Sequence, residues 1–496
     1  MTNKRARTPR GLDVVLLALI SAALAYQLLV PPNIGLADNG DFSRVAYPLG
    51  IYALQEIGSA QFFGWIVPRY RFDAKRIWFH GLCCYSSQTL FGVLALPAAR
   101  LISSKGEFRI KSRGIINGLS FLAATWVLLL ALRPLHLTLH LLAGVLLLLV
   151  FSDVAYAAYF NSFYTEPSTL IFFLASVGFA LQIAQRPDPP RSLLLSFVLS
   201  AALLATSRPQ NAMLGLVFAG LGLRLVRHTA NRSRRRFLAV AVGALSLLCL
   251  WYFRQTPRPL HKVFLYNTVF YDLLRNSPNP HEDLAALGLP ADFDRLIGTV
   301  AFTPGIPISE ESFQRAFFRR ISYATIVRFY LVRPARFWKA IERAAGQAFK
   351  MRPLELGNYA RTTGKPAGSQ SQSFAIWSGA KERLAPGHAW FVITYLLTNL
   401  AVAAVVRRLA RSRALALAGE IWAAIALVAA LQFAVATLGG GTSGLIRHFF
   451  LFNAASDVLF VALCILAGAG LFAILQARRR DATRECWTST AETPAQ

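Results

Sequence analysis

The sequence predicts an all-α polytopic membrane protein, in which a bundle of about twelve transmembrane helices carries a mainly helical periplasmic region. Three observations support this fold class. Hydrophobic residues make up 55% of the 496 residues and charged residues only 15%, whereas soluble domains carry about 25% charged residues. Apolar stretches long enough to cross roughly 30 Å of hydrocarbon recur along the chain. Basic residues gather between these stretches, as expected of cytoplasmic loops.

The first apolar stretch, residues 12–30, follows a basic N-terminal segment. Because basic residues favour the cytoplasmic side, we expect the N-terminus to be inside and the chain beyond Val30 to be outside. A cleaved signal peptide is the alternative, since Ala23 to Ala25 resembles a cleavage site, but the apolar run continues to Val30. Either reading leaves the following loop outside.

The formal net charge of +28 is better explained by membrane topology than by nucleic-acid binding, because the basic residues lie in short clusters between apolar segments. The clusters are residues 105–113, 186–191, 224–236, 407–413 and 478–484. We expect all of them to be cytoplasmic, in a multi-pass protein of a bacterial inner (cytoplasmic) membrane that binds no nucleic acid.

Further spans are predicted at residues 82–102, 115–132, 170–184, 193–205, 212–225, 237–253, 390–406, 414–438 and 449–476. If the clusters at 105–113 and 186–191 are both inside, the chain between them crosses an even number of times. Residues 135–163 are therefore expected to form two short or broken helices, which gives about twelve crossings with both termini inside. A single helix there would require a misassigned cluster.

The predicted organisation has three parts. Residues 1–256 form an N-terminal transmembrane module with a long first periplasmic loop, 31–81; residues 257–386 form a periplasmic region; residues 387–496 form C-terminal transmembrane helices and a cytoplasmic tail. Within the first loop, residues 51–66 are predicted to form an interfacial amphipathic helix. Helices are predicted at 309–332 and 335–349, and an apolar stripe on the first is expected to pack on the bundle or, alternatively, to rest on the outer leaflet.

Two carboxylates, Asp38 and Asp41, follow the first span around Gly40. One interpretation is an Asx turn, since Asp, Asn and Gly are the residues that turns require. The functional interpretation is a general base, with or without a divalent cation such as Mg²⁺ or Mn²⁺ held between the two side chains. Glu166 is a third acid predicted on the same face, where its alternative role is to complement the dipole of the helix that follows.

Polar residues from four predicted outer loops are expected to converge on these acids and bind substrate. They are Arg44, His80, Asn161, Tyr164, Arg208, Gln210, Asn211, Arg447 and His448. An arginine on the outer side runs against the positive-inside bias. Arg208 is therefore favoured as a phosphate ligand, and contact with a lipid headgroup is the alternative. A lone histidine such as His448 is more often structural. Acids and guanidinium groups on one face suit a reaction that needs a base and an anionic leaving group.

ATP-driven transport is disfavoured, because Gly357 and Gly364 before Lys365 have the wrong spacing for a phosphate-binding loop and Pro366 replaces its Ser or Thr. The five cysteines show neither metal-ligand spacing nor a disulfide framework.

The run from Ala37 to Val45 resembles the acidic motif of bacterial glycan-biosynthesis hexosyltransferases in the GT-C superfamily, of the kind related to S-layer glycan assembly. Residues 160–167 and 207–211 resemble further signatures of that group. The resemblance covers most of the chain to about residue 302 and again near residues 448–457. It implies a GT-C-like bundle and a cell-envelope glycosyltransferase with a periplasmic active site.

The resemblance also implies an inverting transfer of a hexose or pentose from a polyprenyl-phosphate donor to a glycan, lipid or protein acceptor. Asp38, or Asp41 if the alignment slips, would be the base, and Glu166 would match a second periplasmic acid. Arg208, Arg44 or a divalent ion would meet the charge of the leaving polyprenyl phosphate. The rival interpretations are a transporter or flippase of a lipid-linked sugar and a non-catalytic cell-envelope assembly protein.

Overall fold

The computed structural model describes residues 10–54, 63–77, 86–102, 106–439 and 444–491, and it describes side chains as far as residue 476. Within these ranges seven helices are long and apolar enough to cross a membrane. They are α1 (Arg10–Leu29), α4 (Ile110–Leu132), α7 (Glu166–Ala184), α10 (Arg232–Arg254), α17 (Ala389–Arg408), α18 (Arg413–Gly439) and α20 (Phe450–Ala491). Each coincides with a predicted span, so the chain is a multi-pass membrane protein.

Other predicted spans have shorter helices. These are α3 (Gln88–Ile102), α8 (Arg191–Ala205) and α9 (Asn211–His228). Between residues 135 and 163 the structure has α5 (Leu137–Phe151), followed at a bend of 58° by α6 (Val154–Ala157) and η1 (Ala158–Asn161). The break falls at Asp153, whose carboxylate accepts the Ala155 N–H (2.9 Å) and so begins a new helix. A broken helix was expected here; the count of about twelve crossings stays a prediction.

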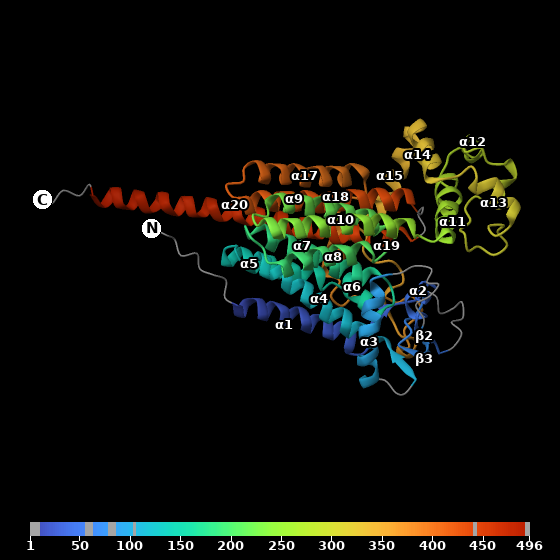
Figure 1. The fold of residues 1–496 in the computed structure, drawn as a ribbon, viewed down its shortest axis with the longest axis horizontal. Helices are drawn as coiled ribbons and strands as arrows, with labels where there is room; N and C mark the ends of the chain where they lie inside the picture. The colour runs from blue at the N-terminus through green and yellow to red at the C-terminus, as the bar shows by residue number, and fades with distance from the viewer. Residues whose placement is uncertain (1–9, 55–62, 78–85, 103–105, 440–443, 492–496) are drawn as a thin grey trace.

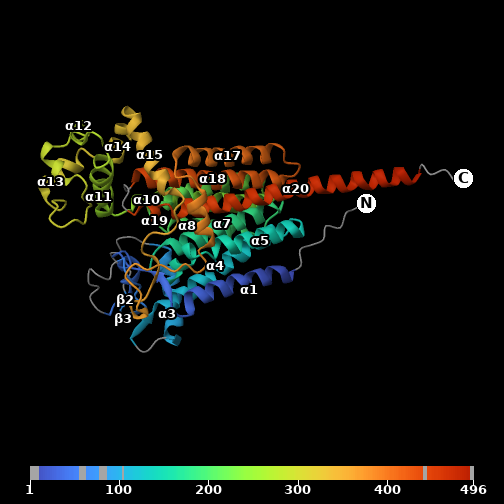
Figure 2. The ribbon, with the colours of Figure 1, turned by 180° about the vertical axis from the view of Figure 1, so that it is seen from behind.

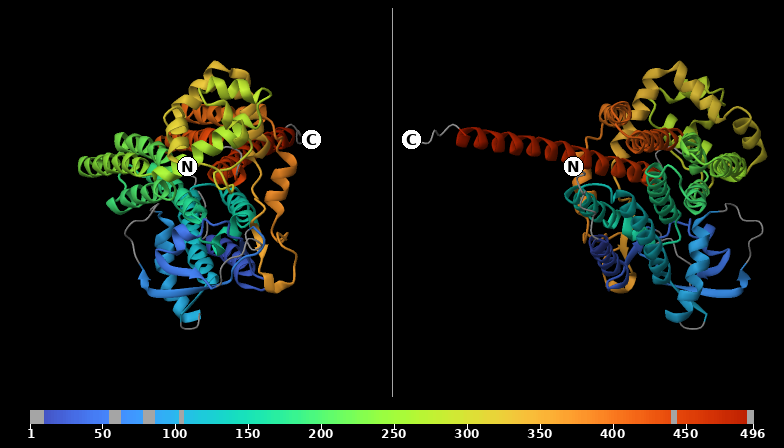
Figure 3. Two further views of the ribbon diagram at one scale, coloured as in Figure 1. Left: turned by 90° about the vertical axis from the view of Figure 1, so that its right-hand side faces the viewer. Right: turned by 60° about the vertical axis from the view of Figure 1, so that its left-hand side comes forward.

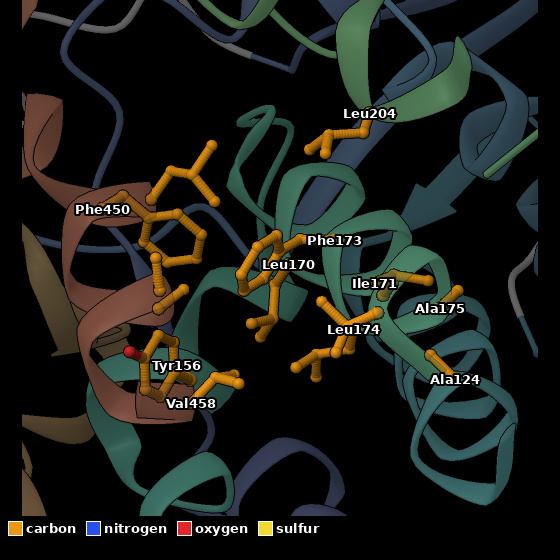
Figure 4. Close-up of a cluster of buried hydrophobic side chains, with 14 of the residues drawn as sticks. Ala124, Tyr156, Leu170, Ile171, Phe173, Leu174, Ala175, Leu204, Phe450 and Val458 are labelled. Carbon is orange, nitrogen blue, oxygen red and sulfur yellow. The ribbon is translucent and has the colours of Figure 1, made fainter. Parts of the chain in front are cut away.

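Helix α7 lies at the centre of the bundle. In the stretch of α7 that could span the membrane, 83% is buried within the protein, whereas the corresponding share is 17–50% in the other six spans. Figure 4 shows its side chains between those of α4, α6, α8 and α20, with Phe173 and Leu174 facing Phe450 and Val458. Because every face of α7 is apolar, its sequence has no polar stripe to turn outward.

The helices of the bundle run side by side, and the strands and α11 to α15 lie together at one end (Figures 1 and 2). We call this end the site end. Helix α20 extends beyond the bundle at the opposite end, where α1 begins (Figure 1). Figure 3 shows α8, α9 and α10 grouped on one side, with α17 and α18 beside them.

The first loop contains strands where a helix was predicted. β2 (Leu49–Ala53) pairs antiparallel with β3 (Arg69–Ile77), which pairs with β4 (Glu107–Arg109). The predicted interfacial helix at 51–66 is therefore wrong for residues 51–54, and residues 55–62 lie outside the described part of the chain. Leu49 and Ile51 are fully buried, because alternate side chains of a strand face the same side.

A second strand pair joins distant parts of the sequence. β1 (Ile34–Leu36) pairs antiparallel with β5 (Leu356–Tyr359), and the Ala37 N–H donates to the Glu355 carbonyl (2.9 Å). Gly35 permits this course, since a Cβ there would lie 2.7 Å from the backbone oxygen of Asn161. The pairing holds the start of the first loop against the segment that follows α15.

The segment between α10 and α17 forms short helices, of which those from α11 to the start of α15 share a second core, while the rest of α15 packs in the core of the bundle. The short helices are α11 (Arg258–Tyr266), η2 (Asn267–Leu274), α12 (Pro280–Ala286), η3 (Ala291–Leu296), α13 (Glu311–Phe318), α14 (Tyr323–Val332), α15 (Pro334–Ala348), η4 (Arg361–Thr363) and α16 (Ile376–Leu384). The helix predicted at 309–332 is two helices, because the Ser322 side chain accepts the Thr325 N–H (3.2 Å) and caps a new one. Phe313 and Phe317 of the predicted stripe are buried in this separate core, so packing of the stripe on the bundle was a wrong prediction.

One buried acid fastens α16 to the bundle. Asp457 of α20 accepts hydrogen bonds from the Tyr156 hydroxyl (2.6 Å), Trp377 Nε1 (3.0 Å) and Lys381 Nζ (2.5 Å). Asp457 and Lys381 are 1% and 8% exposed. The carboxylate therefore neutralises an ammonium group that has little access to water.

We expect Asp457→Ala to lower the free energy of unfolding by about 3 kcal/mol, because it leaves the Lys381 ammonium buried without its counter-charge. Thermal unfolding in detergent measures the effect. Glu311→Ala is the control, since Glu311 pairs with Arg315 on the surface, and it should leave the melting temperature unchanged. Equal melting temperatures for the two variants would contradict the role given to Asp457.

Candidate active site

A small pocket of about 70 Å³ lies at the site end of the bundle. Most of its lining comes from four segments: α2 (Ser43–Ala46) with the turn before it, the residues that lead into α7, the turn between α8 and α9, and α19 (Leu445–His448). Single residues from before α3 and from α10 and α11 complete it. The lining residues are Asp41, Arg44, Val45, Ser86, Phe163, Tyr164, Thr165, Glu166, Ser207, Arg208, Pro209, Tyr252, Leu260 and Arg447. Six of the predicted site residues are thus brought together: Asp41, Arg44, Tyr164, Glu166, Arg208 and Arg447.

Ion pairs connect the charged groups of the pocket. Asp41 Oδ1 lies 3.1 Å from Arg44 Nη2, and Asp41 Oδ2 lies 2.7 Å from Arg447 Nη2. Arg208 Nη1 donates to Glu166 Oε1 at 2.9 Å. The guanidinium of Arg447 also lies over the Tyr164 ring, 4.6 Å from its centre. Three guanidinium groups therefore face two carboxylates, which leaves the lining with one cation in excess.

Several polar atoms of this lining are buried without a hydrogen-bond partner among the described residues. They are Glu166 Oε2, Arg447 Nε and Arg447 Nη1. The Arg447 Nε to Glu166 Oε1 distance is 3.9 Å, too long for a hydrogen bond. Buried donors and acceptors are normally satisfied, and each one left unpaired costs about 1–3 kcal/mol. Groups of this kind are suited to a polar ligand.

Asp38 has a different environment. Its Oδ1 accepts the N–H groups of Gly40 (2.8 Å) and Phe42 (3.3 Å), and its side chain does not line the pocket. These are the hydrogen bonds of an Asx turn, the interpretation weighed from the sequence. Gly40 has a φ of 97°, a conformation that favours glycine at this turn. Burial raises the pKa of Asp38, although the backbone N–H groups oppose the rise.

The pKa values of Asp41 and His448 are both lowered. Burial acts to raise the pKa of Asp41, but the guanidinium groups of Arg447 and Arg44 outweigh it and lower the pKa. Burial, together with the charges of Arg208 and Arg447, lowers the pKa of His448 to about 3. At neutral pH Asp41 is therefore ionised and His448 is neutral.

Four other predicted residues lie outside the pocket lining. The Asn161 amide donates to the carbonyls of Leu28 (3.0 Å) and Ile34 (2.8 Å) and so ties α1 to β1. The Asn211 amide donates to the Thr169 and Ser207 hydroxyls (3.1 and 2.8 Å). Gln210 precedes α9 without capping it. His80 lies outside the described residues, and His448 contacts Phe264 ring to ring, with centres 6.2 Å apart.

Sequence reasoning missed Glu355. Its side chain is 7% exposed, and it lies near enough to Arg447, Glu166 and Asp41 for their charges to act on it; burial raises its pKa. The β1–β5 pairing brings Glu355 to the first loop, and no local motif indicates that pairing. Ser86 and Tyr252 were also missed, since neither stands in a motif of charged residues.

The residues present do not fit a cation held between Asp38 and Asp41. Both Asp41 oxygens already face guanidinium groups, and Asp38 Oδ1 is turned to backbone N–H groups. Within the described ranges no group of three or more His, Cys, Asp or Glu side chains is arranged to hold a metal ion.

The fold and the pocket together define a class, the multi-pass helical membrane proteins with a charged site at one end of the bundle. A family model described as the YfdI N-terminal transmembrane domain matches residues 2–485. The chain belongs to this family.

The chain is also similar to two solved membrane proteins. One is the archaeal oligosaccharyltransferase AglB from Archaeoglobus fulgidus in complex with an inhibitory peptide and a dolichol-phosphate, at 13% identity and a TM-score of 0.41, covering 98% of this chain and 52% of that one. The other is ArnT from Cupriavidus metallidurans bound to undecaprenyl phosphate, at 13% identity and a TM-score of 0.30, covering 92% and 76%. The chain spans about half the length of AglB. No curated protein matches it.

The lowered pKa of Asp41 predicts a pH-dependent contribution to stability. Because the folded-state pKa lies below the ordinary value of 3.8, the ionised side chain stabilises the fold above that pH, and the stabilisation is lost as pH falls through the folded-state pKa. Wild type should therefore melt at a higher temperature than Asp41→Asn at pH 6, and the gap should begin to narrow below about pH 4.

Thermal unfolding in detergent between pH 3 and 6 measures this gap. Asp292→Asn is the control, since Asp292 is exposed, and it should melt with the wild type at every pH. A constant gap for Asp41→Asn across the range would show that its ion pairs do not stabilise the fold.

Proposed function

We propose that this protein is a GT-C-type membrane glycosyltransferase. It transfers a hexose or pentose from a polyprenyl-phosphate donor to a glycan, lipid or protein acceptor, with inversion at the anomeric carbon. The observation that carries the proposal is the pocket itself, in which Asp41 and Glu166 face three guanidinium groups and Arg447 keeps buried N–H donors unpaired. Such a lining supplies a base and the cations for an anionic leaving group.

In the proposed reaction Asp41 is the general base. An acceptor hydroxyl attacks the anomeric carbon of the donor sugar and its proton passes to the Asp41 carboxylate. The new C–O bond forms as the bond from the anomeric carbon to the phosphate oxygen breaks. Polyprenyl phosphate leaves with that electron pair, and Arg208 and Arg447 meet its charge. We prefer Asp41 to Asp38 because Asp41 lines the pocket, whereas Asp38 accepts backbone N–H groups.

The ion pairs of the pocket explain how a carboxylate with a lowered pKa becomes a base. Arg447 pairs with Asp41, and Arg208 pairs with Glu166. A donor phosphate competes with these carboxylates for the two guanidinium groups, since bidentate arginine–phosphate contacts are strong. When Arg447 turns to the phosphate, Asp41 loses its nearest positive charge and its pKa rises. Donor binding thereby readies the base for the acceptor.

The setting fits the substrates of such an enzyme. A pocket at the end of a transmembrane bundle lets a donor keep its tail in the bilayer while its phosphate stays at the interface. We propose that this end faces the periplasm of a bacterial inner membrane, and that residues 257–386 bind the acceptor for cell-envelope glycan biosynthesis.

We expect Asp41→Asn to lower the turnover number by about a hundredfold to ten-thousandfold, because removal of a general base costs that much. The assay follows sugar transfer from a radiolabelled polyprenyl-phosphate sugar to candidate acceptors in proteoliposomes. Asp38→Asn is the matched control, since it removes a neighbouring carboxylate of the same loop, and it should retain more activity than Asp41→Asn.

The same assay separates the rival functions. Full turnover in Asp41→Asn would reject Asp41 as the base, and loss confined to Asp38→Asn would give the role to Asp38. Labelled sugar that crosses the bilayer without being transferred indicates a transporter or flippase. If the sugar is neither transferred nor moved across the bilayer, and cell-envelope assembly is intact in both variants, the protein is a non-catalytic assembly protein.

We expect transfer to continue in excess EDTA. The reason is that Arg44, Arg208 and Arg447 already supply the positive charge that a divalent cation would bring. Initial rates are compared with and without EDTA, and then after addition of Mg²⁺ or Mn²⁺. A rate abolished by EDTA and restored by either ion would overturn this expectation and show a cation requirement.

A further inference from the structure

A groove runs along the bundle between α9 and α17, with α18 as its floor. Both α9 and α17 pack on α18, and residues of all three helices line the groove. The groove has a volume of about 650 Å³. Its lining residues are Met213, Leu216, Val217, Gly220, Leu221, Arg224, Leu400, Ala403, Ala404, Arg407, Gly419, Glu420, Ala423, Ala424, Leu427 and Leu431.

The groove is charged at one end only. Arg224 forms a bidentate ion pair with Glu420, in which Nε donates to Oε2 (3.0 Å) and Nη2 donates to Oε1 (2.6 Å). Arg407 Nε lies 3.2 Å from the same Glu420 Oε1. Arg413 begins α18 about two turns earlier, and its Nε is buried without an acceptor among the described residues. Two guanidinium groups therefore share a single carboxylate. The charge of Arg413 acts on His228 together with those of Arg224 and Arg407, and the excess positive charge of this cluster can bind an anion.

The length of the groove matches one leaflet of a bilayer. Along α9 the lining extends from Met213 to Arg224, and along α18 from Gly419 to Leu431. At 1.5 Å per residue these two stretches measure about 17 and 18 Å, close to half of the roughly 30 Å of hydrocarbon in a membrane. The α17 wall, from Leu400 to Arg407, is shorter, at about 10 Å. The charged end would then lie at the level of the lipid headgroups, with the apolar part beside the acyl chains.

We propose that this groove binds an anionic phospholipid, with one acyl chain along the apolar walls and the phosphate-bearing headgroup at Arg407 and Arg413. The charge at the mouth selects an anionic lipid, because each nearby cation contributes about 1 kcal/mol to such binding. The site is separate from the candidate active site. Arg208 precedes α9, whereas Arg224 lies near the end of that helix, about 24 Å away along its axis.

Native mass spectrometry of the full-length protein tests the proposal, with phosphatidylglycerol and phosphatidylcholine of identical acyl chains as probes. Wild type should retain more phosphatidylglycerol. Gly220→Leu should lower its retention by about tenfold, since the new side chain occupies the groove. A Cβ at Gly220 meets no atom within 4 Å, so the substitution fills space without a clash. Arg407→Gln should reduce the preference for phosphatidylglycerol by about fivefold and leave the Arg224–Glu420 pair in place.

Gly243→Leu is the matched control, because Gly243 of α10 is also an exposed helical glycine whose Cβ would meet open space, and it lies outside the groove lining. It should bind lipid as wild type does. Ala404→Leu, on the α17 wall, repeats the test if Gly220→Leu does not fold. The proposal would be overturned if wild type retained the two lipids equally, or if Gly243→Leu lost as much bound phosphatidylglycerol as a groove variant. It would also be overturned if wild type retained polyprenyl phosphate in preference to phosphatidylglycerol.

Discussion

The guanidinium of Arg447 holds the candidate site together. It lies 2.7 Å from an oxygen of Asp41 and covers the ring of Tyr164. Its side chain is only 12% exposed, so removal of the Asp41 carboxylate would leave a buried cation without its nearest partner. The first loop, the start of α7 and the segment between α18 and α20 all have to be correctly placed before this contact can form.

The elements around Arg447 are held in place by contacts between segments that are distant in the sequence. The β1–β5 pairing fixes the chain on either side of the first loop, and the Asp457 contacts fix α16 to the bundle. Charge is distributed similarly at the two ends of α9 and α18, since each end has more guanidinium groups than carboxylates. At the site end the excess serves a proposed reaction, and at the other end it marks a proposed lipid headgroup site.

Hydrophobicity predicted the seven long spans correctly, because a length of apolar sequence is a local property. The interfacial helix predicted at residues 51–66 was wrong for the described residues, 51–54 and 63–66. At 51–53 the reason is that β2 pairs with β3, and amphipathicity within one segment does not reveal such a partner. In the site, the spacing of Asp38 and Asp41 indicated a carboxylate pair. It did not indicate which side chain turns to the backbone N–H groups. Glu355 reaches the site through a strand pairing across most of the sequence, and no local pattern predicts that.

The Asp41–Arg447 contact has a consequence for synthesis in the cell. The two residues stand near opposite ends of the sequence, so α1 and its loop enter the membrane long before α19 has been made. During that interval Asp41 can pair with Arg44 of the same loop, but its closer partner Arg447 does not yet exist. A chain released before residue 447 would have every residue of the pocket lining except Arg447. Completion of the pocket is therefore also a check that translation has reached the last transmembrane helices.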